Sequence, residues 1–278
     1  MKTNFKKVVR TRIKEAIVWA KMPVGQYCKK PDFLIIGAQK AGTTALFNYL
    51  SKHPDIGLPI KKEIHFFDLN YFRGVNWYLA HFPLKFKKKK ITGEATPYYL
   101  FHPYVPKRVY QYFPDIKLII ILRNPIDRAF SHFQMEVRNG REKKKNFNYA
   151  FENEILRLNK IDLSKLEDPY YQDDDHRNHL YFERGKYSKQ ISAWLNYFPK
   201  SNIHIILYEE FFSDVNTNFK KVCTFLNIKK IEIRNSKIYN KGNYNKIETK
   251  TRDKYLKYLQ IEKNNLEKLL NKKINWNN

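Results

Sequence analysis

Cysteine is scarce in this sequence, and long apolar runs are missing from it. The two cysteines, Cys28 and Cys223, lie far apart, so the chain encodes no disulfide framework and no cysteine-based metal cluster. No stretch reaches the roughly 18 to 20 consecutive apolar residues that a membrane span needs. The best candidate, residues 13–24, is short and interrupted by charged residues, and it lacks the long apolar core of a secretory signal. We therefore expect a soluble protein of a reducing compartment.

Acidic residues are also in short supply. Only 27 Asp and Glu stand against 53 Lys and Arg, which gives a formal net charge of +26. A basic surface is typical of proteins that bind a nucleic acid, an acidic glycan, an anionic lipid or a phosphorylated cofactor. Most of the excess is lysine, however, and this profile is also what codon bias in an A/T-rich genome produces. The charge alone leaves both interpretations open.

The sequence contains neither an internal repeat nor a Gly/Ser-rich linker, which favours a single domain. Its 278 residues suffice for a sizeable core, and an apolar content of 42% with 16% aromatic residues excludes wholesale disorder. Residues 1–31 are basic and weakly amphipathic, and we interpret them as an N-terminal arm that forms a solvated helix rather than a membrane anchor. The domain itself is expected over residues 32–278.

Apolar strand patterns alternate with amphipathic helical patterns along that domain. Strands are predicted at residues 33–36, 91–94, 118–122 and 203–208, and helices at residues 43–52, 104–112, 125–138, 187–198, 215–226 and 250–270. This alternation predicts an α/β fold with a central parallel sheet and helices on both faces. Residues 159–180 have no clear period, so we expect a long loop there, either functional or simply solvated.

A glycine-containing loop lies between the first predicted strand and the helix after it. Residues 37–44 read Gly-Ala-Gln-Lys-Ala-Gly-Thr-Thr. The loop resembles a P-loop, whose backbone N–H groups and helix N-terminus bind phosphate oxygens. Thr43 stands where nucleotide triphosphatases carry their lysine, and a lysine lies inside the loop at Lys40 instead. This rearrangement argues against the usual Mg-triphosphate geometry, and an ordinary strand-to-helix turn remains the alternative.

The strongest predicted strand leads into Arg123. Open α/β sheets bind ligands at the carboxyl ends of their strands, and Ser131 follows about two helical turns later. The two side chains could therefore face one crevice. An arginine and a hydroxyl form a sound phosphate clamp because a guanidinium binds phosphate bidentately. By itself this motif is weak, since an arginine near a helix start is common.

A third motif, residues 61–68, places carboxylates beside basic residues and a histidine. Glu63 in this setting suits proton abstraction from a hydroxyl. The neighbouring residues also have ordinary interpretations. His65 could be a hydrogen-bonded core histidine, and Asp68 could cap a following turn.

Taken together, these motifs resemble the sulfotransferases that use 3′-phosphoadenosine 5′-phosphosulfate (PAPS), especially the heparan sulfate branch. The resemblance extends from about Phe33 to Leu270, and several motifs in order are far more specific than any one of them. They are residues 36–44, 53–55, 62–68, 74–78 with 82–83, 93–99, 122–131, and 185–187 with 194–195 and 198–199. The fold that the resemblance implies is a P-loop-like three-layer arrangement.

The resemblance implies transfer of a sulfuryl group from PAPS to a hydroxyl or amino group, with a glycan or glycolipid as the acceptor. Glu63 would be the general base, His65 and Asp68 would orient the acceptor or Glu63, and Lys40 would stabilise charge on the leaving group. Neither a metal nor a nucleic-acid partner is expected. The residues implied to bind the nucleotide are Lys40, Ala41, Gly42, Thr43, Thr44, Arg123, Ser131, Lys241 and Gly242.

The sequence also departs from the heparan enzymes. Those enzymes usually carry a lysine where this chain has Ala95, so one cationic contact to the reaction centre is missing. They carry a cysteine-bridged loop near the C-terminus, whereas this chain has only Lys241-Gly242-Asn243 without nearby cysteines. Their Golgi membrane anchor is absent too, which indicates a bacterial or viral cytoplasmic relative with at most peripheral contact at the inner face of the membrane.

Two other classes of function compete with this interpretation. A P-loop kinase or nucleotide hydrolase would need a lysine next to Gly42 and an acidic Mg²⁺ ligand at a strand end, but Thr43 and Arg123 occupy those places. A non-enzymatic module that binds polyanions would account for the basic charge. It would not account for the order of strand, phosphate loop and carboxylate.

Overall fold

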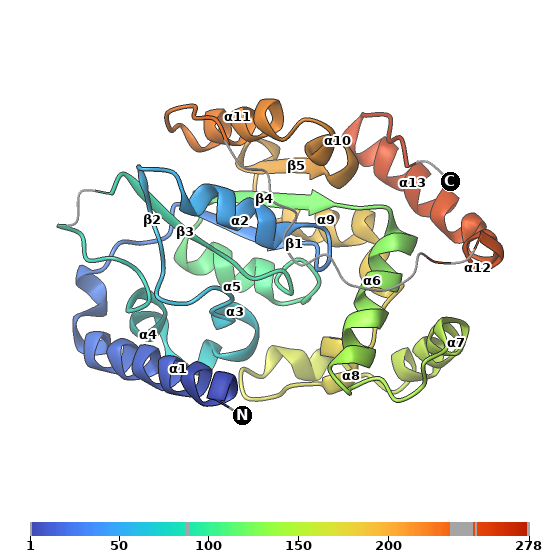
Figure 1. Cartoon of the computed structure of the whole chain (residues 1–278), viewed down its shortest axis with the longest axis horizontal. Coiled ribbons are helices and arrows are strands. Elements are labelled where there is room, and N and C mark those ends of the chain that lie inside the picture. The colour runs from blue at the N-terminus through green and yellow to red at the C-terminus, as the bar shows by residue number, and fades with distance from the viewer. Residues whose placement is uncertain (1, 87–88, 234–246, 248, 277–278) are drawn as a thin grey trace.

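The computed structural model describes residues 2–86, 89–233, 247 and 249–276. Its centre is a five-stranded sheet in the order β2-β3-β1-β4-β5, in which every neighbouring pair is parallel. Helices lie on both sides of this sheet (Figure 1), so the predicted α/β fold is confirmed. The strands are β1 (Phe33–Gly37), β2 (Ile56–Gly57), β3 (Ile91–Ala95), β4 (Lys117–Leu122) and β5 (Ile203–Leu207).

The apolar strands occupy the middle of the core. All residues of β1 are buried, as are those of β4 from Leu118 onward, because helices cover both faces of the sheet. The four predicted strands are all present. Strand β2 was not predicted, since two residues are too short to give a pattern.

The described helices follow the predicted alternation. Helices α2, α5, α6, α9 and α11 correspond to predicted ones. The α-helices are α1 (Lys2–Lys21), α2 (Thr43–Ser51), α3 (Phe66–Leu69), α4 (Val75–Leu79), α5 (Val105–Tyr112), α6 (Pro125–Arg138), α7 (Phe147–Leu158), α8 (Asp174–Asn178), α9 (Tyr187–Leu195), α10 (Tyr208–Ser213), α11 (Val215–Leu226), α12 (Thr249–Lys254) and α13 (Leu256–Leu270). The 3₁₀ helices are η1 (Met22–Tyr27), η2 (Tyr71–Arg73), η3 (Leu163–Glu167), η4 (Glu183–Gly185) and η5 (Lys200–Asn202).

Two predictions about secondary structure need correction. Residues 159–180 are not a continuous loop, because aspartate caps start two short helices there. The Asp162 carboxylate accepts from the Ser164 N–H at 3.0 Å to begin η3, and the Asp173 carboxylate accepts from the His176 N–H at 2.7 Å to begin α8. The predicted helix 250–270 is broken at the buried Tyr255, which separates α12 from α13.

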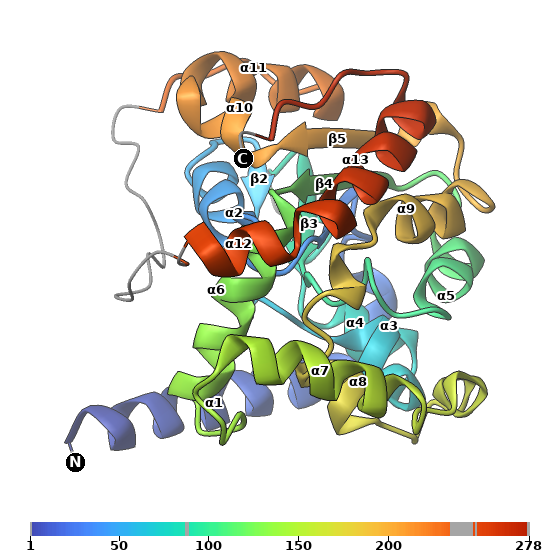
Figure 2. The same ribbon diagram turned by 90° about the vertical axis from the view of Figure 1, so that its right-hand side faces the viewer.

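The N-terminal residues form a helix, as predicted, and its C-terminal end packs on the domain. Val18 of α1 is buried, and the Lys21 ammonium donates to the Phe82 carbonyl at 2.7 Å. The following η1 lies against α4, with Gly25 so close to the Asn76 backbone that a side chain would not fit. Helix α1 therefore holds a fixed orientation along one edge of the molecule (Figure 2).

Candidate active site

The predicted functional segments all follow carboxyl ends of adjacent parallel strands. The glycine-containing loop follows β1, Arg123 follows β4, the motif of residues 93–99 begins in the last residues of β3, and Glu63 follows β2 after a short connection. Neighbouring parallel strands end at the same edge of a sheet, so topology gathers segments that are distant in sequence. This edge is the candidate active site.

The loop after β1 has the backbone shape of an anion site. Gly42 has φ of +96° and caps α2, while a side chain there would meet the Phe212 ring at 2.9 Å. Glycine is thus required both for conformation and for space. Thr43 and Thr44 form the first turn of α2, where backbone N–H groups have no partner within the helix. Lys40 has a φ of +70°, a backbone conformation that residues other than glycine rarely adopt.

Three arginines donate hydrogen bonds to this loop, which itself contains Lys40. Arg123 Nη1 donates to the Lys40 carbonyl and Arg128 Nη1 to the Gln39 carbonyl, each at 3.4 Å, and Arg184 Nη1 donates to Gln39 Oε1 at 2.5 Å. Burial lowers the pKa of Lys40, and the charges of Arg138, Arg123 and Arg128 lower it further, while the charge of Glu136 acts in the opposite direction. This excess of like charge in a partly buried place favours the binding of a further anion.

Two of these arginines are fully or almost fully buried, which no local sequence pattern predicts. Arg128 is 0% exposed and Arg184 is 3% exposed, and the Nε atom of each has no hydrogen-bond partner among the described residues. Burial lowers the pKa of Arg184 to about 10. Buried cations with unused donors are typical of a site for an acidic ligand. Arg128 lies within the motif of residues 122–131 and Arg184 directly before the motif of residues 185–187, but neither side chain was assigned a role, because only the fold shows that both reach the loop after β1.

Arg123, one half of the predicted clamp, lies beside this loop. The Arg123 guanidinium stacks over the Tyr208 ring at 4.9 Å, and the Tyr187 hydroxyl donates to the Arg123 carbonyl at 2.9 Å. Ser131 is buried on α6. The N-terminus of helix α6 is capped by Asn124, whose side chain accepts a hydrogen bond from the Ile126 N–H at 3.0 Å. Lys241 and Gly242 lie outside the described residues.

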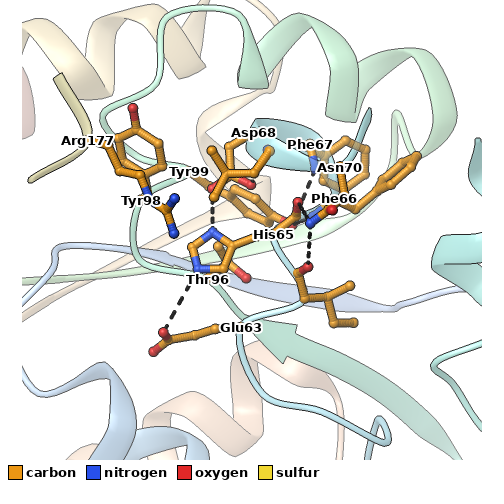
Figure 3. Close-up of polar contacts among 12 residues, drawn as sticks. Glu63, His65, Phe66, Phe67, Asp68, Asn70, Thr96, Tyr98, Tyr99 and Arg177 are labelled. Atoms are coloured by element: carbon orange, nitrogen blue, oxygen red, sulfur yellow. Dashed lines mark hydrogen bonds and ion pairs between the residues drawn. The ribbon is translucent and has the colours of Figure 1, made fainter. Parts of the chain in front are cut away.

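The third motif folds into a chain of two carboxylates and an imidazole (Figure 3). His65 Nδ1 lies 2.7 Å from Asp68 Oδ2, and His65 Nε2 lies 4.0 Å from Glu63 Oε2. The exposed fraction rises along this chain: 0% for the Asp68 side chain, 21% for His65 and 43% for Glu63. Glu63 is thus the member that can meet a substrate.

His65 carries more positive charge in this setting than a free imidazole would. Burial opposes its protonation, but the charge and hydrogen bond of Asp68 and the charge of Glu63 outweigh that effect, so the pKa of His65 is raised. The charge of Arg177 on α8 acts in the opposite direction, and Figure 3 shows its guanidinium near the imidazole. Helix α8, within the segment that the sequence predicted as a long loop, therefore places a cation near the imidazole that contacts Asp68 and Glu63.

A buried carboxylate that the sequence did not single out holds this motif in place. Glu94 is 0% exposed; its Oε1 accepts from the hydroxyls of Tyr78 and Tyr99, both at 3.0 Å. Its Oε2 accepts from the Thr96 hydroxyl at 2.7 Å and from the Ile64 N–H at 3.2 Å. The last of these bonds fixes the backbone between Glu63 and His65.

The same network continues one residue further. The Tyr99 hydroxyl accepts from the Phe66 N–H at 2.9 Å, and the Asn70 amide donates to the His65 carbonyl at 2.9 Å. Glu63 and His65 both have positive φ, +58° and +56°. Non-glycine residues adopt this conformation only where surrounding contacts require it, and these bonds supply that requirement.

Arg184 joins the two halves of the site. Besides its bond to Gln39 in the phosphate loop, its Nη2 donates to the His176 carbonyl of α8 at 3.0 Å. Its guanidinium also lies 4.8 Å from the centroid of the Tyr98 ring. The phosphate loop, the segment after β3 and α8 are therefore connected through one buried side chain.

Comparison with known proteins gives consistent matches. A family model described as "Sulfotransferase domain" matches residues 30–275. "Membrane-associated sulfotransferase kil1" of Dictyostelium discoideum is 26% identical over 342 residues, covering 99% of this chain and 72% of that protein. "Heparan sulfate glucosamine 3-O-sulfotransferase 5" of Mus musculus is 32% identical over 200 residues, covering 71% of this chain and 54% of that protein. The chain thus spans about half the length of this heparan relative.

A solved structure agrees with these matches. The crystal structure of a sulfotransferase from Alicyclobacillus acidocaldarius superposes with a TM-score of 0.73 at 29% identity, covering 88% of this chain and 98% of that one. The predicted cytoplasmic location is wrong in the light of the comparisons, because the Dictyostelium relative, aligned over nearly the whole chain, is membrane-associated. No helix in the described part of the chain combines the length and apolar character of a membrane span.

The raised pKa of His65 gives a first prediction. In Asp68→Asn the imidazole loses the charge that favours its protonation, so we expect its pKa to fall. NMR titration of the histidine side chains measures this directly. Asp175→Asn, which alters the carboxylate 2.9 Å from His179 Nδ1, is the matched control and should leave His65 unchanged.

Stability should follow the same titration. A raised folded-state pKa stabilises the native protein fully below the unfolded value of about 6.5, and this contribution is lost as the pH rises through the folded-state pKa. Asp68→Asn should remove that part of the pH dependence. An unaltered His65 titration in this variant would show that Asp68 does not control the imidazole.

The Glu94 network gives a second prediction. Glu94→Ala leaves four buried donors without their acceptor, so we expect the free energy of unfolding to fall by about 3 kcal/mol or more. Glu94→Gln keeps the shape and part of the acceptor capacity and should cost less. Urea denaturation measures both, with the exposed Glu167→Gln as control. An alanine variant as stable as the parent would mean that the network does not hold the motif.

Proposed function

This chain belongs to the sulfotransferase family, and on that premise we propose that PAPS is its sulfuryl donor and a glycan hydroxyl or amino group its acceptor. Membership makes the protein a transferase, so the kinase and the non-enzymatic polyanion module are both set aside. The observation that carries the proposal is the meeting, at one sheet edge, of a cation-lined phosphate loop and an exposed carboxylate.

The loop after β1 suits the 5′-phosphosulfate end of the donor. The N–H groups of Gly42, Thr43 and Thr44, with Ala41 beside them, would bind its oxygens, and Lys40 would oppose the negative charge that grows on the leaving oxygen. Arg123 and Ser131 would hold the 3′-phosphate, which distinguishes this nucleotide from ATP. Lys241 and Gly242 are assigned to the nucleotide on the resemblance alone.

Glu63 suits the role of general base. It would accept the proton of the acceptor hydroxyl or amine as that atom attacks sulfur, while the bond from sulfur to the phosphate oxygen breaks and the 3′,5′-bisphosphate leaves. His65, held by Asp68, would orient the Glu63 carboxylate toward the acceptor. Since the reaction is an in-line transfer, most of the catalysis would come from positioning and charge stabilisation.

The acceptor would be chosen by elements around Glu63. The mouse relative is named for a heparan sulfate glucosamine, which supports a glycan acceptor here. Residues 159–180 and the segment after Lys61 border this side, and Tyr170 stacks on Phe72 at 5.0 Å between ring centroids. Arg177 on α8 adds positive charge there. Residues 32–278 would work as one catalytic domain.

Ligand-induced stabilisation tests the donor. Thermal unfolding should be shifted by 3′-phosphoadenosine 5′-phosphate, with or without magnesium, and far less by ATP. A ligand at 100 times its dissociation constant stabilises the native state by about 2.7 kcal/mol. A magnesium-dependent shift with ATP alone would contradict the donor assignment, and a shift with neither nucleotide would contradict it too.

Substitution of Glu63 tests the base. In Glu63→Gln we expect kcat for sulfuryl transfer to fall by about 100-fold or more, because the amide cannot accept the proton. The thermal shift with the bisphosphate should be unchanged. Glu167→Gln, an exposed carboxylate on η3, is the matched control and should keep full turnover. Full activity in Glu63→Gln would show that another group is the base.

A further inference from the structure

Helix α1 presents an apolar stripe to solvent. Val9, Ile13 and Ile17 follow one another at intervals of four residues and are 38%, 55% and 44% exposed. Ala16 and Ala20, also exposed, lie on the same face. Residues four apart are neighbours on a helix surface, so these side chains form one continuous stripe. An amphipathic helix of a soluble domain normally turns such a stripe inward.

Helix α1 docks on the domain through its C-terminal turns, on the side away from the stripe, whereas its N-terminal turns are exposed on that side too, with Val8 47% exposed. Val18, one residue after Ile17, is buried against the body, and Lys21 bonds to the Phe82 carbonyl. On an α-helix each residue is rotated by about 100° from the last, which puts Val9 and Ile13 nearly opposite Val18. Figure 2 shows the N-terminal turns of α1 extending past the neighbouring helices.

Basic residues border the stripe on both sides. At helical spacing Arg12 lies along one margin, while Arg10 and Lys14 lie along the other. Arg10 and Arg12 are both exposed. Glu15, the one acidic residue in the sequence of α1, is exposed but lies outside the stripe, at 60° from Val18 on an ideal helix of about 100° per residue. The outer face therefore combines an apolar centre with cationic margins.

We propose that α1 docks this protein on an anionic lipid surface. An apolar stripe with arginines at its margins suits the boundary between headgroups and acyl chains, where the stripe is buried and the guanidinium groups meet lipid phosphates. The cationic margins select an anionic surface over a neutral one by charge complementarity. The helix lies in the interface and does not cross it. This inference does not depend on the donor, the acceptor or the catalytic residues.

A tryptophan beside the stripe provides a direct readout. Trp19 is 54% exposed, whereas Trp77, Trp194 and Trp276 are 8%, 0% and 3% exposed. Transfer of Trp19 toward an apolar environment should therefore dominate any blue shift of the fluorescence emission. Co-sedimentation with vesicles measures binding independently.

The experiment mixes the full chain with vesicles of phosphatidylcholine, with or without phosphatidylglycerol. We expect co-sedimentation and a blue shift only with the anionic vesicles. Ile13→Ser/Ile17→Ser should weaken binding at least about tenfold, because the stripe loses its apolar area. Arg10→Gln/Arg12→Gln should weaken it about 30-fold at low salt, at roughly 1 kcal/mol for each charge.

Matched controls are needed because a chain of net charge +26 attracts anionic vesicles without specificity. Ile261→Ser removes an isoleucine of α13 that is 56% exposed, about as much as Ile13. Lys257→Gln/Lys268→Gln removes two charges from exposed positions on the same helix. Both controls should bind vesicles nearly as well as the parent protein. Thermal unfolding should confirm that all variants are folded.

Three outcomes would overturn the proposal. Equal binding by the stripe variant and the parent would leave only non-specific charge attraction. Binding to neutral vesicles that equals binding to anionic ones would remove the role of the arginines. A dimer in sedimentation velocity that Ile13→Ser/Ile17→Ser converts to a monomer would identify a second copy of the chain as the occupant of the stripe.

Discussion

One buried carboxylate connects the sheet to the proposed catalytic motif. Glu94 accepts four hydrogen bonds at the end of β3, from two tyrosines, a threonine and the backbone of Ile64. Burial raises the pKa of Glu94, against the effect of those bonds. Its neighbours hold Glu63 and His65 in left-handed backbone conformations. The proposed base, Glu63, thus owes its position to a side chain that is fully buried.

The charge of the site is arranged in two layers. Buried Arg128 and Arg184 lie behind the phosphate loop and bond mainly to carbonyl oxygens, while Lys40 and Arg123 lie nearer to solvent. Burying a guanidinium costs free energy, and neutral carbonyl acceptors offset only part of it. A bound polyanion would complete the compensation. The fold therefore maintains, in its interior, a charge pattern that suits an acidic ligand.

Arg184 also relates the nucleotide side of the site to the proposed acceptor side. It contacts Gln39 in the phosphate loop and the backbone of α8, and α8 carries Arg177 toward His65. Helix α8, within residues 159–180, thus contacts the candidate site and is not simply a solvated connection. Helix α1 lies apart from this machinery and offers the molecule a separate surface.

Local pattern determined much of this protein. The apolar runs of β1 and β4 predicted the parallel sheet, because strand burial depends on near neighbours in sequence. The phosphate site expected at the loop around Lys40 rests on equally local helix-start chemistry and stays a prediction. The capped helices in residues 159–180 and the break at Tyr255 were not predicted, because their sequence patterns are too short. The cytoplasmic location was wrong because an absent membrane span does not exclude attachment to a membrane.

Only the tertiary structure identified Glu94, Arg128 and Arg184, whose partners lie far away along the chain, as Gln39 does from Arg184. It alone decided that the stripe of α1 faces outward, because periodicity defines a helix face and only packing decides what that face meets.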